Sequence, residues 1–350
     1  MAKGGLTLDL PQNARRAMLV LQYNGKDVSK DIAKSLTGFQ YNDAASGSLD
    51  DISISLEDTG RNWQGAWVPS EGDRIHATIR TINWDAPNEI KKLPLGTFEV
   101  DSIEFNGPPD TVAIKAVSLP ISSEIRMQQS SRAWEKTNLN TVAAEVAKRA
   151  KLKLLYRAEE NPSYDHLEQT EQSDLSFLLE TATREGIAIK VSNGTLVMFD
   201  ESVYEKKSPI ATITRGEDNV KGYGFSINTA YSAYRACTIT YTPPKRKEPV
   251  QATYTPAGAP KTGPILKINE QVDDQAAAIQ LARKRLRERN KEGGKGSLSL
   301  MGDIRMAAGL TINIVGWKRF DGKYIIESAR HVIGSGGYTT DLEIRKVLGW

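Results

Sequence analysis

The sequence has little of what most enzymes and secreted proteins rely on. Its 350 residues include one cysteine, Cys237, so the chain can form neither an intrachain disulfide nor a cysteine-based metal cluster. The three histidines, His76, His166 and His331, match no HxxxH or HExxH metal motif. The motifs GxSxG, GxxxxGK[ST] and CxxC are also missing. We therefore predict no metal, no cofactor and no catalytic residue.

Long apolar runs and a strong charge of one sign are missing as well. No stretch approaches the ~20 consecutive apolar residues that cross a bilayer. The N-terminal sequence MAKGGLTLDLPQNARR lacks the apolar core of a secretory signal. The formal net charge of +3 arises from 46 basic and 43 acidic residues, so it does not indicate a polyanion as a general partner. We expect a protein that folds in the cytoplasm and does not insert into a membrane.

The segment Gln172–Asp200 carries the clearest local signals. Its first half predicts a helix that begins after the N-cap Ser173 and ends at a left-handed glycine, Gly186. Asn193 and Gly194 then predict a type I′ turn between two strands. The apolar residues expected on the buried stripe of the helix are Leu175, Leu178, Leu179 and Ala182. The apolar pairs expected across the turn are Val191 with Leu196 and Ile189 with Met198.

The period of the hydrophobic pattern divides the chain into regions. Short alternating strands separated by turn residues fill the first and last regions, whereas helical spacing marks the middle one. We predict a mainly β fold with an α+β insertion, in which two similar β-barrel domains flank a small α+β module. The predicted regions are an N-terminal arm (1–16), a first barrel (17–120), the α+β module (121–205) with a helix over 137–150, and a second barrel (206–350) that contains a Pro-rich loop (243–264) and a helix (272–292).

The two β regions share a sequence pattern. Gly96–Ile103 (GTFEVDSI) and Gly322–Ala329 (GKYIIESA) both read Gly-x-aromatic-x-aliphatic-x-Ser. Upstream, Gly72–Ile75 (GDRI) corresponds to Gly309–Ile312 (GLTI). Either small β domains share such turns in general, or one domain has been duplicated around the α+β module. Duplication would let a ring of three chains present six similar units, matching a six-fold ring on one side and a three-fold object on the other.

Acidic residues cluster before the helix of the central segment. Two of Glu168, Glu171 and Asp174 could act as the paired carboxylates of a peptidoglycan hydrolase. The alternative is a solvated acidic loop that leads into a helix N-terminus, and composition favours that alternative. The remaining acids of the cluster are Glu159, Glu160 and Asp165.

Basic residues crowd the helix predicted near the C-terminus, over 283–291. They suggest a nucleic-acid-binding module, although no aromatic residues are interleaved with them. A basic helix that docks on an acidic partner chain is the competing hypothesis. The cations concerned are Arg283, Lys284, Arg285, Arg287, Arg289 and Lys291, with Lys245, Arg246 and Lys247 in the preceding loop.

Three tryptophans stand in positions typical of protein contacts. Trp63 and Trp67 lie in a polar, glycine-containing loop, and Trp350 is the last residue of the sequence. Aromatic residues in such positions often anchor an interface. Local packing over the rim of a barrel would explain them equally well.

The order of several motifs resembles a known family. The helix over 137–150 sits where that family has one. The motifs are Gln172–Leu178 (QSDLSFL), Arg184–Ile187 (REGI), Ser328–Ile333 (SARHVI) and Gly337–Leu342 (GYTTDL). Through these residues the chain resembles the late control gene D family, the hub proteins of contractile phage tails and related injection systems.

The resemblance implies a homotrimeric baseplate hub. Its two tail-tube-like β-barrels would form a pseudo-hexameric ring that joins the six-fold tail tube to the three-fold spike. The implied partners are the tail tube or a tube-initiator protein, a separate trimeric spike protein and baseplate wedge proteins, with DNA only passing through the channel. The family offers no active site, so no catalytic residue is carried over. The implied location is the baseplate of a virion or tail-like particle that is assembled in the bacterial host cytoplasm.

Overall fold

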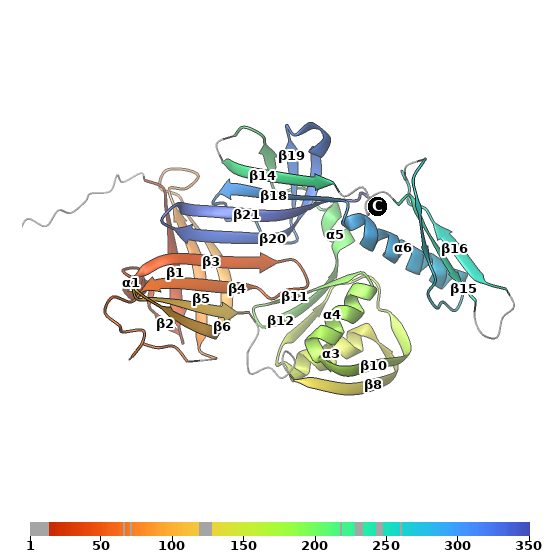
Figure 1. Ribbon diagram of the computed structural model, residues 1–350, viewed down its shortest axis with the longest axis horizontal. Coiled ribbons are helices and arrows are strands. Elements are labelled where there is room, and N and C mark those ends of the chain that lie inside the picture. Colours follow the sequence, from red (N-terminus) through yellow and green to blue (C-terminus); the bar gives the residue numbers. More distant parts are fainter. Residues whose placement is uncertain are drawn as a thin grey trace, which may run out of the picture. The chain divides into compact units, whose positions relative to one another are not determined.

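The computed structural model describes residues 14–118 except 66 and 71, 128–217, 219–227, 234–242, 248–259 and 261–350. Strands predominate among these residues, and a few helices interrupt them (Figure 1), which confirms the predicted mainly β fold with an α+β insertion. Contacts divide the chain into two compact units, and the predicted domain boundaries stay predictions. Unit 1 takes the described residues of Met1–Tyr41, Asp51–Ser122 and His331–Thr339, and unit 2 those of Asn42–Asp50, Ser123–Arg330 and Thr340–Trp350.

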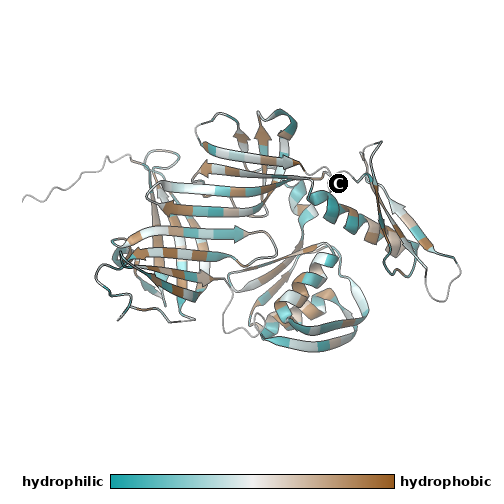
Figure 2. Cartoon of the chain, in the orientation of Figure 1, coloured by the Kyte–Doolittle hydropathy of each residue, from teal (hydrophilic) through white to brown (hydrophobic). Residues whose placement is uncertain are grey.

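Unit 1 is built on an antiparallel sheet. Its strands pair in the order β3-β4-β7-β6-β5-β1-β2. Alternate residues of β4 and β5 are buried, as the hydrophobic pattern predicts, and hydrophobic and hydrophilic residues alternate along the strands in Figure 2. The elements are β1 (Arg16–Tyr23), β2 (Lys26–Asp27), α1 (Ser29–Ile32), β3 (Leu36–Ala44), β4 (Asp51–Glu57), β5 (Arg74–Ile82), β6 (Ile90–Asn106) and β7 (Thr111–Val117). Residues 1–13 of the predicted N-terminal arm lie outside the described part.

The α+β module of unit 2 contains the central segment. The Ser173 hydroxyl accepts a hydrogen bond from the Ser176 N–H at 3.2 Å, so Ser173 is the predicted N-cap. Gly186 has φ +75°, the left-handed conformation predicted for the helix end. The elements are β8 (Gln129–Asn138), α3 (Leu139–Arg149), β9 (Lys153–Tyr156), β10 (Ser163–Ser173), α4 (Asp174–Arg184), β11 (Ile187–Ser192), β12 (Thr195–Asp200) and α5 (Glu201–Lys206).

The hairpin of the module also has the predicted register. Asn193 and Gly194 have φ values of 48° and 67°, as a type I′ turn requires. The pairs Val191–Leu196 and Ile189–Met198 face each other across β11 and β12. The buried stripe of α4 differs from the prediction, because Leu175 and Leu179 are half-buried. The buried face of α4 consists of Asp174, Phe177, Leu178, Thr181 and Ala182.

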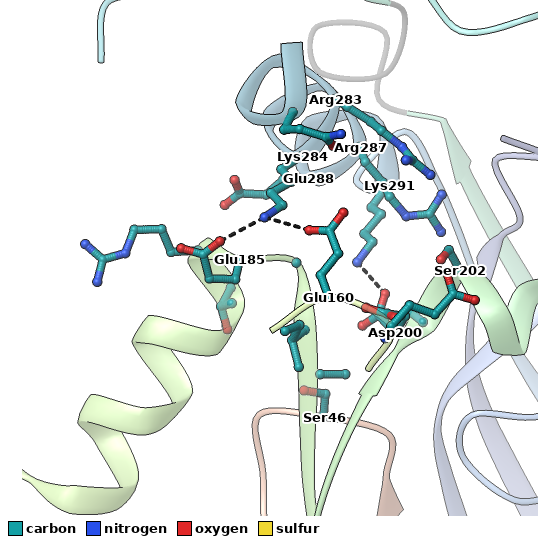
Figure 3. A pocket seen from close by; sticks show the side chains of 18 residues that line it. Ser46, Glu160, Glu185, Asp200, Ser202, Arg283, Lys284, Arg287, Glu288 and Lys291 are labelled. Atoms are coloured by element: carbon teal, nitrogen blue, oxygen red, sulfur yellow. Dashed lines mark hydrogen bonds and ion pairs between the residues drawn. The ribbon is translucent and has the colours of Figure 1, made fainter. Parts of the chain in front are cut away.

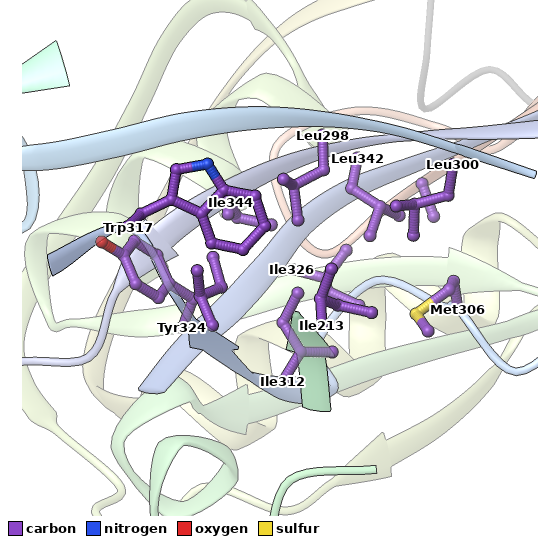
Figure 4. Packing of buried hydrophobic residues seen from close by; sticks show 12 residues of the cluster. Ile213, Leu298, Leu300, Met306, Ile312, Trp317, Tyr324, Ile326, Leu342 and Ile344 are labelled. Atoms are coloured by element: carbon purple, nitrogen blue, oxygen red, sulfur yellow. The ribbon is translucent and has the colours of Figure 1, made fainter. Parts of the chain in front are cut away.

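A second set of paired strands, called the second sheet below, lies mostly in unit 2 and has the strand order β14-β18-β21-β20-β19-β13. Its apolar core gathers around Trp317, Tyr324 and Ile326 (Figure 4). The elements are β13 (Thr212–Thr214), β14 (Val220–Ile227), β18 (Gly294–Met301), β19 (Thr311–Val315), the short 3₁₀ helix η1 (Lys318–Phe320), β20 (Gly322–Gly334) and β21 (Gly337–Lys346). No helix among the described residues is long and apolar enough to span a membrane.

The two sheets have the same strand order. When the strands are matched in chain order, β1, β3, β4, β5, β6 and β7 correspond to β13, β14, β18, β19, β20 and β21. The unit 1 order β3-β4-β7-β6-β5-β1 then becomes the unit 2 order β14-β18-β21-β20-β19-β13 without any change. One pairing differs in direction, because β13 is parallel to β19 whereas β1 is antiparallel to β5.

The registers of one matched pairing, β5–β6 and β19–β20, agree from Arg74–Glu99 and Thr311–Ile325 to Ala77–Gly96 and Ile314–Gly322. Ile75 pairs with Phe98 in unit 1, and Ile312 pairs with Tyr324 in unit 2. Upstream, the Gly72 N–H donates to the Val100 carbonyl at 3.1 Å, and the Gly309 N–H donates to the Ile326 carbonyl at 2.8 Å. The return bonds, Val100 N–H to Asp73 carbonyl and Ile326 N–H to Leu310 carbonyl, also match. If small β domains merely shared glycine-containing turns in general, their strand registers would not need to agree. The agreement in register therefore favours duplication.

A small sheet and a long helix separate β14 from β18. β16 pairs with β15 inside the segment that we predicted as a loop over 243–264, so that prediction is wrong for residues 250–254. Residues 243–247 lie outside the described part. Strand β16 alternates buried and exposed residues, with Val250 and Ala252 buried. This alternation is short and lies in a stretch rich in proline and threonine, so the sequence analysis did not recognise it. The elements are β15 (Ala236–Tyr241), β16 (Val250–Tyr254), β17 (Ile265–Ile268) and α6 (Gln275–Lys291), whose helix was predicted over 272–292.

Candidate functional site

The predicted acidic loop is a strand, which corrects the sequence interpretation. β10 pairs antiparallel with β8, and the register shifts between Gln169 and Gln172. Only Leu167 and Gln169 of β10 are buried, so the strand lacks the apolar alternation that would have revealed it. Glu171 lies within the register shift with φ 45°.

The three candidate carboxylates have different environments. Glu168 and Glu171 are exposed, whereas Asp174 is buried at the start of α4. A paired-carboxylate hydrolase needs one carboxyl group that stays protonated near neutral pH. Burial alone would raise the pKa of Asp174, but hydrogen bonds from Gln169 and Arg149 and the positive charges of Arg149 and Arg132 outweigh it and hold that pKa below its usual value. Asp174 is therefore unsuited to act as a proton donor.

Asp174 instead joins four elements of the module. Its carboxylate accepts from Arg149 Nε at 2.7 Å and from Arg132 Nη1 at 3.1 Å. Gln169 Nε2 donates at 2.9 Å and Ser130 Oγ lies at 3.3 Å. These partners come from β8, α3 and β10, so the carboxylate is an ionic centre of the fold.

The basic helix predicted over 283–291 is the last half of α6, and its acidic partners belong to the same chain. Lys284 Nζ lies 2.8 Å from Glu185 and 3.1 Å from Glu160 (Figure 3). Arg285, Arg287 and Lys291 also form ion pairs, with Glu270 and Glu288, with Glu205 and with Glu201 respectively. Most of the positive charge is thus neutralised inside unit 2, which removes the main ground for a nucleic-acid interface. Arg283 and Arg289 are exposed.

The ion pairs of Lys284 and Lys291 line a pocket of about 220 Å³ between α6, the end of α4, β11 and α5 (Figure 3). Burial raises the pKa of Asp200 at its floor, although the Glu159 N–H donates to this carboxylate at 2.6 Å. Around the pocket, Lys284 is paired with Glu160 and Glu185, and Lys291 is paired with Glu201. These ion pairs hold α6 against the α+β module.

A second ionic centre, around Arg345, escaped the sequence analysis. The side chain of Arg345 is 2% exposed and reaches Glu205 at 2.8 Å and Glu201 at 3.1 Å through Nη2. Its Nε lies 3.2 Å from Glu327. The residues Arg345 and Glu201 are 144 positions apart, so no local pattern could signal their contact.

A third ionic centre lies around the half-buried Lys190, which holds the end of β3 and the segment after it against β11. Lys190 contacts the carboxylates of Asp43 and Asp50, the latter at 3.2 Å, and donates to the Ala44 carbonyl at 2.9 Å. Burial raises the pKa of Asp50 to about 6 despite the charge of Lys190. Burial also opposes the charge of Lys190, but the two carboxylates outweigh it and raise the pKa of the ammonium group.

The histidines and the cysteine have ordinary surroundings. His76 Nδ1 lies 3.2 Å from the Thr97 hydroxyl, and exposed His166 Nδ1 lies 2.7 Å from Glu135. Buried His331 contacts the Tyr338 hydroxyl at 2.7 Å. Burial raises the pKa of the Cys237 thiol to about 11, so it is a weak nucleophile. The described residues contain no group of three or more side chains placed to hold a metal ion.

The tryptophans fall into two environments. Trp350 contacts Tyr254 at 6.1 Å between ring centroids, and its carbonyl accepts from Arg287 Nη1 at 2.5 Å, so it packs locally. Trp63 and Trp67 contact each other edge to face at 5.7 Å, and Trp67 is 53% exposed. This pair borders a cavity in unit 1.

Comparisons with known proteins agree on one class. A family model described as phage tail baseplate hub (GPD) matches residues 119–337. A probable baseplate hub protein of Escherichia phage 186 is 21% identical over 381 residues, which cover 97% of this chain and 95% of that protein. A namesake in Escherichia phage P2 is 25% identical over 235 residues, which cover 65% and 57%.

Solved structures of tail proteins share the fold. The 43 kDa tail protein of prophage MuSo2 from Shewanella oneidensis has a TM-score of 0.70 at 13% identity and covers 94% of this chain and 98% of its own. A tail protein from Neisseria meningitidis MC58 has a TM-score of 0.69 at 13% identity, with 95% and 97% covered. The Escherichia coli c3393 protein, a component of the type VI secretion system described as similar to the T4 tail proteins gp27 and gp5, has a TM-score of 0.55 at 10% identity, with 93% and 76% covered.

Proposed function

The chain belongs to the phage tail baseplate hub (GPD) family, and from that premise we propose how it acts as the structural hub of a contractile tail or tail-like particle. Three copies form a ring, and the two matched sheets of each chain close into tube-like barrels. The ring then offers six similar positions to a six-fold tail tube and three positions to a trimeric spike.

The observation that carries this proposal is the agreement in strand order and register between the two sheets. A six-fold neighbour needs six nearly equal contact surfaces, and a trimer can supply them only if each chain folds the same surface twice. Ile75 against Phe98 and Ile312 against Tyr324 show this equality at the level of single backbone pairs. The rest of each chain, including the α+β module, occurs once per copy and so suits a three-fold partner.

The proposed partners are the tail tube or a tube-initiator protein, a separate trimeric spike protein and baseplate wedge proteins. DNA would touch the hub only while it passes through the channel. The hub would assemble in the bacterial host cytoplasm and reside in the baseplate. The similarity in fold to a secretion-system component that is itself compared with T4 gp27 and gp5 supports a position between tube and spike.

We propose that the hub has no catalytic role of its own. The hydrolase hypothesis relied on Glu168, Glu171 and Asp174, and Asp174 is committed to ion pairs with Arg132 and Arg149. Zymography on peptidoglycan tests the point, with the Glu171→Gln variant as the matched control. We expect no clearing by either protein. Clearing by the natural chain that disappears in the variant would establish the enzyme.

Stoichiometry tests the ring. The hub should be produced with its tube and spike proteins and examined by native mass spectrometry, with the hub alone as the control. We expect three hub copies per complex, since each copy supplies two of the six positions. A hub that stays monomeric with both partners present would contradict the proposal.

A further inference from the structure

Unit 1 contains an apolar cavity of about 480 Å³ that no part of the proposed ring mechanism uses. Its floor is the sheet core, with Leu21, Ile54 and Ile75 nearly inaccessible to solvent. Its mouth is bordered by Trp63, Trp67, Val68 and the region around α1. The cavity therefore leads from the protein surface directly to hydrophobic core side chains.

The side chains at the mouth are unusually exposed for their type. Trp67 is 53% exposed and Val68 is 47% exposed. Trp63 braces Trp67 edge to face at 5.7 Å, so the pair forms one wall. Charged residues at the border are Lys26 and Asp31, one of each sign. An apolar hollow with an aromatic wall and a sparse polar rim is typical of a site for an apolar peptide.

The sequence before the described residues offers a matching peptide. Leu6, Leu8 and Leu10 alternate with Thr7 and Asp9. In an extended chain, alternate residues share one face, so three leucines would face a groove together while Thr7 and Asp9 face outward. We propose that residues 6–10 of a second copy of this chain bind in the cavity beside Trp63 and Trp67. This contact rests on the ring proposed above, because it links neighbouring copies.

The reach of the chain argues for a second copy. The Ala14 carbonyl accepts from Asn83 Nδ2, and Arg16 pairs with Ile82, so the described chain begins at one end of β1. The cavity lies at the other end of β1, around Leu21 and Tyr23. Leu21 is seven residues from Ala14, roughly 23 Å along a strand, whereas Leu10 can lie at most about 14 Å from Ala14. The leucines of one chain cannot all enter their own cavity.

Binding would cover the apolar mouth. The leucines would contact the Trp67 ring and Val68, and the outward Asp9 would face a rim that carries Lys26. An N-terminal arm that inserts into its neighbour adds a contact between copies that lies outside the sheets. The arm would thereby help to hold neighbouring copies together in the ring.

Disulfide trapping between two different variants tests the contact. Full-length hub with Leu8→Cys is mixed with full-length hub carrying Trp67→Cys or Lys26→Cys, and oxidised with the partners that support ring assembly. The matched control pairs Leu8→Cys with Ala86→Cys, an exposed position in the β5–β6 hairpin at the far end of β5. Cys237 is buried and should not compete.

We expect covalent dimers in at least about tenfold excess over the control for one or both cavity positions. Because each chain carries one new cysteine, only a contact between copies can give this product. Equal yields at the cavity and at Ala86 would overturn the inference. If the ring forms normally with equal yields, the proposed function stands and the docking of the arm fails.

A peptide experiment separates docking from assembly. A labelled peptide of residues 1–13 is titrated into the full-length hub, and the control peptide carries Leu6→Ser, Leu8→Ser and Leu10→Ser. Losing three buried leucine side chains should weaken binding at least about tenfold. A natural peptide that binds no better than the serine peptide contradicts the inference even if the hub never forms a ring.

Discussion

Buried charges, rather than reactive groups, are the residues that define this chain. Asp174, Lys190 and Arg345 each lie inside unit 2 and each contact oppositely charged partners from other elements. Removing one member of such a group leaves the others buried without compensation, which costs more than the group contributes as a whole. These residues therefore fix which elements meet.

The first prediction concerns Asp174. The substitution Asp174→Asn should lower the free energy of unfolding of the α+β module by about 2–3 kcal/mol, because Arg149 and Arg132 lose their shared anion while Arg132 keeps access to water. Urea unfolding can be followed through Trp134, which stacks on Phe177 in the same module at 5.3 Å. The matched control Glu168→Gln is exposed and should change stability by less than about 0.5 kcal/mol. A neutral Asp174→Asn variant would contradict our account of this centre.

The second prediction is the pH dependence of the same effect. The pKa of Asp174 is lower in the folded chain than in the unfolded one, so the unfolded chain binds more protons as the pH falls toward 3. The stabilisation is complete above the unfolded pKa of about 3.9 and is lost progressively as the pH falls from there through the lower pKa of the folded chain. The stability difference between natural chain and Asp174→Asn should shrink when urea unfolding is repeated at pH 3. A difference that is the same at pH 7 and pH 3 would assign the effect to something other than the carboxylate charge.

At the scale of elements, the sequence predicted those parts whose signals are local. Ser173, Gly186 and the Asn193-Gly194 turn act on their immediate neighbours, so the helix, its cap and the hairpin register followed from a short segment. The same holds for the buried faces of β4 and β5, because alternation within one strand decides them.

The missed elements are those that depend on distant partners. β8 and β10 are mostly polar, and their pairing, with Leu167 opposite Trp134, holds them instead of an apolar face. Short β16 follows a proline-rich stretch and depends on β15 for its hydrogen bonds. The basic residues of α6 suggested a site for nucleic acid or an acidic partner chain, because their acidic partners are not close in sequence. Glu160, Glu185 and Glu201 lie about a hundred residues before them. The sequence drew attention to Trp63 and Trp67 as interface anchors or rim packing, but it did not predict the cavity beside them.

The third prediction compares matched glycines of the two sheets. Gly96 and Gly322 are the first residues of the sequence pattern that the two β regions share. Their φ values of 104° and 135° are rare for residues with a side chain. Substitution of either by alanine should lower stability by a similar amount, about 1–3 kcal/mol. Gly336 is the control, because nothing lies within 4 Å of where its Cβ would be. Unequal losses at Gly96 and Gly322 in thermal unfolding would weaken the claim that the two strands are equivalent.

At the scale of the whole molecule, the proposed ring assigns different parts of the chain to different partners. The matched strand order occurs twice per chain, so in the proposed ring it would serve a partner with six-fold symmetry. The α+β module, α6 and the small sheet β15–β17 occur once and suit partners with three-fold symmetry. In the proposed ring, one chain would thus connect two symmetries without changing its fold.

The fourth prediction tests this central claim directly. A cryo-electron microscopy map of the assembled particle should resolve the layer that contains this chain. We predict three copies in that layer, with the β5–β6 and β19–β20 hairpins of each copy at the same radius and height, so that six equivalent hairpins face the tube. A layer in which the two hairpins of one copy lie at different radii, or in which six copies fill the ring, would contradict the account.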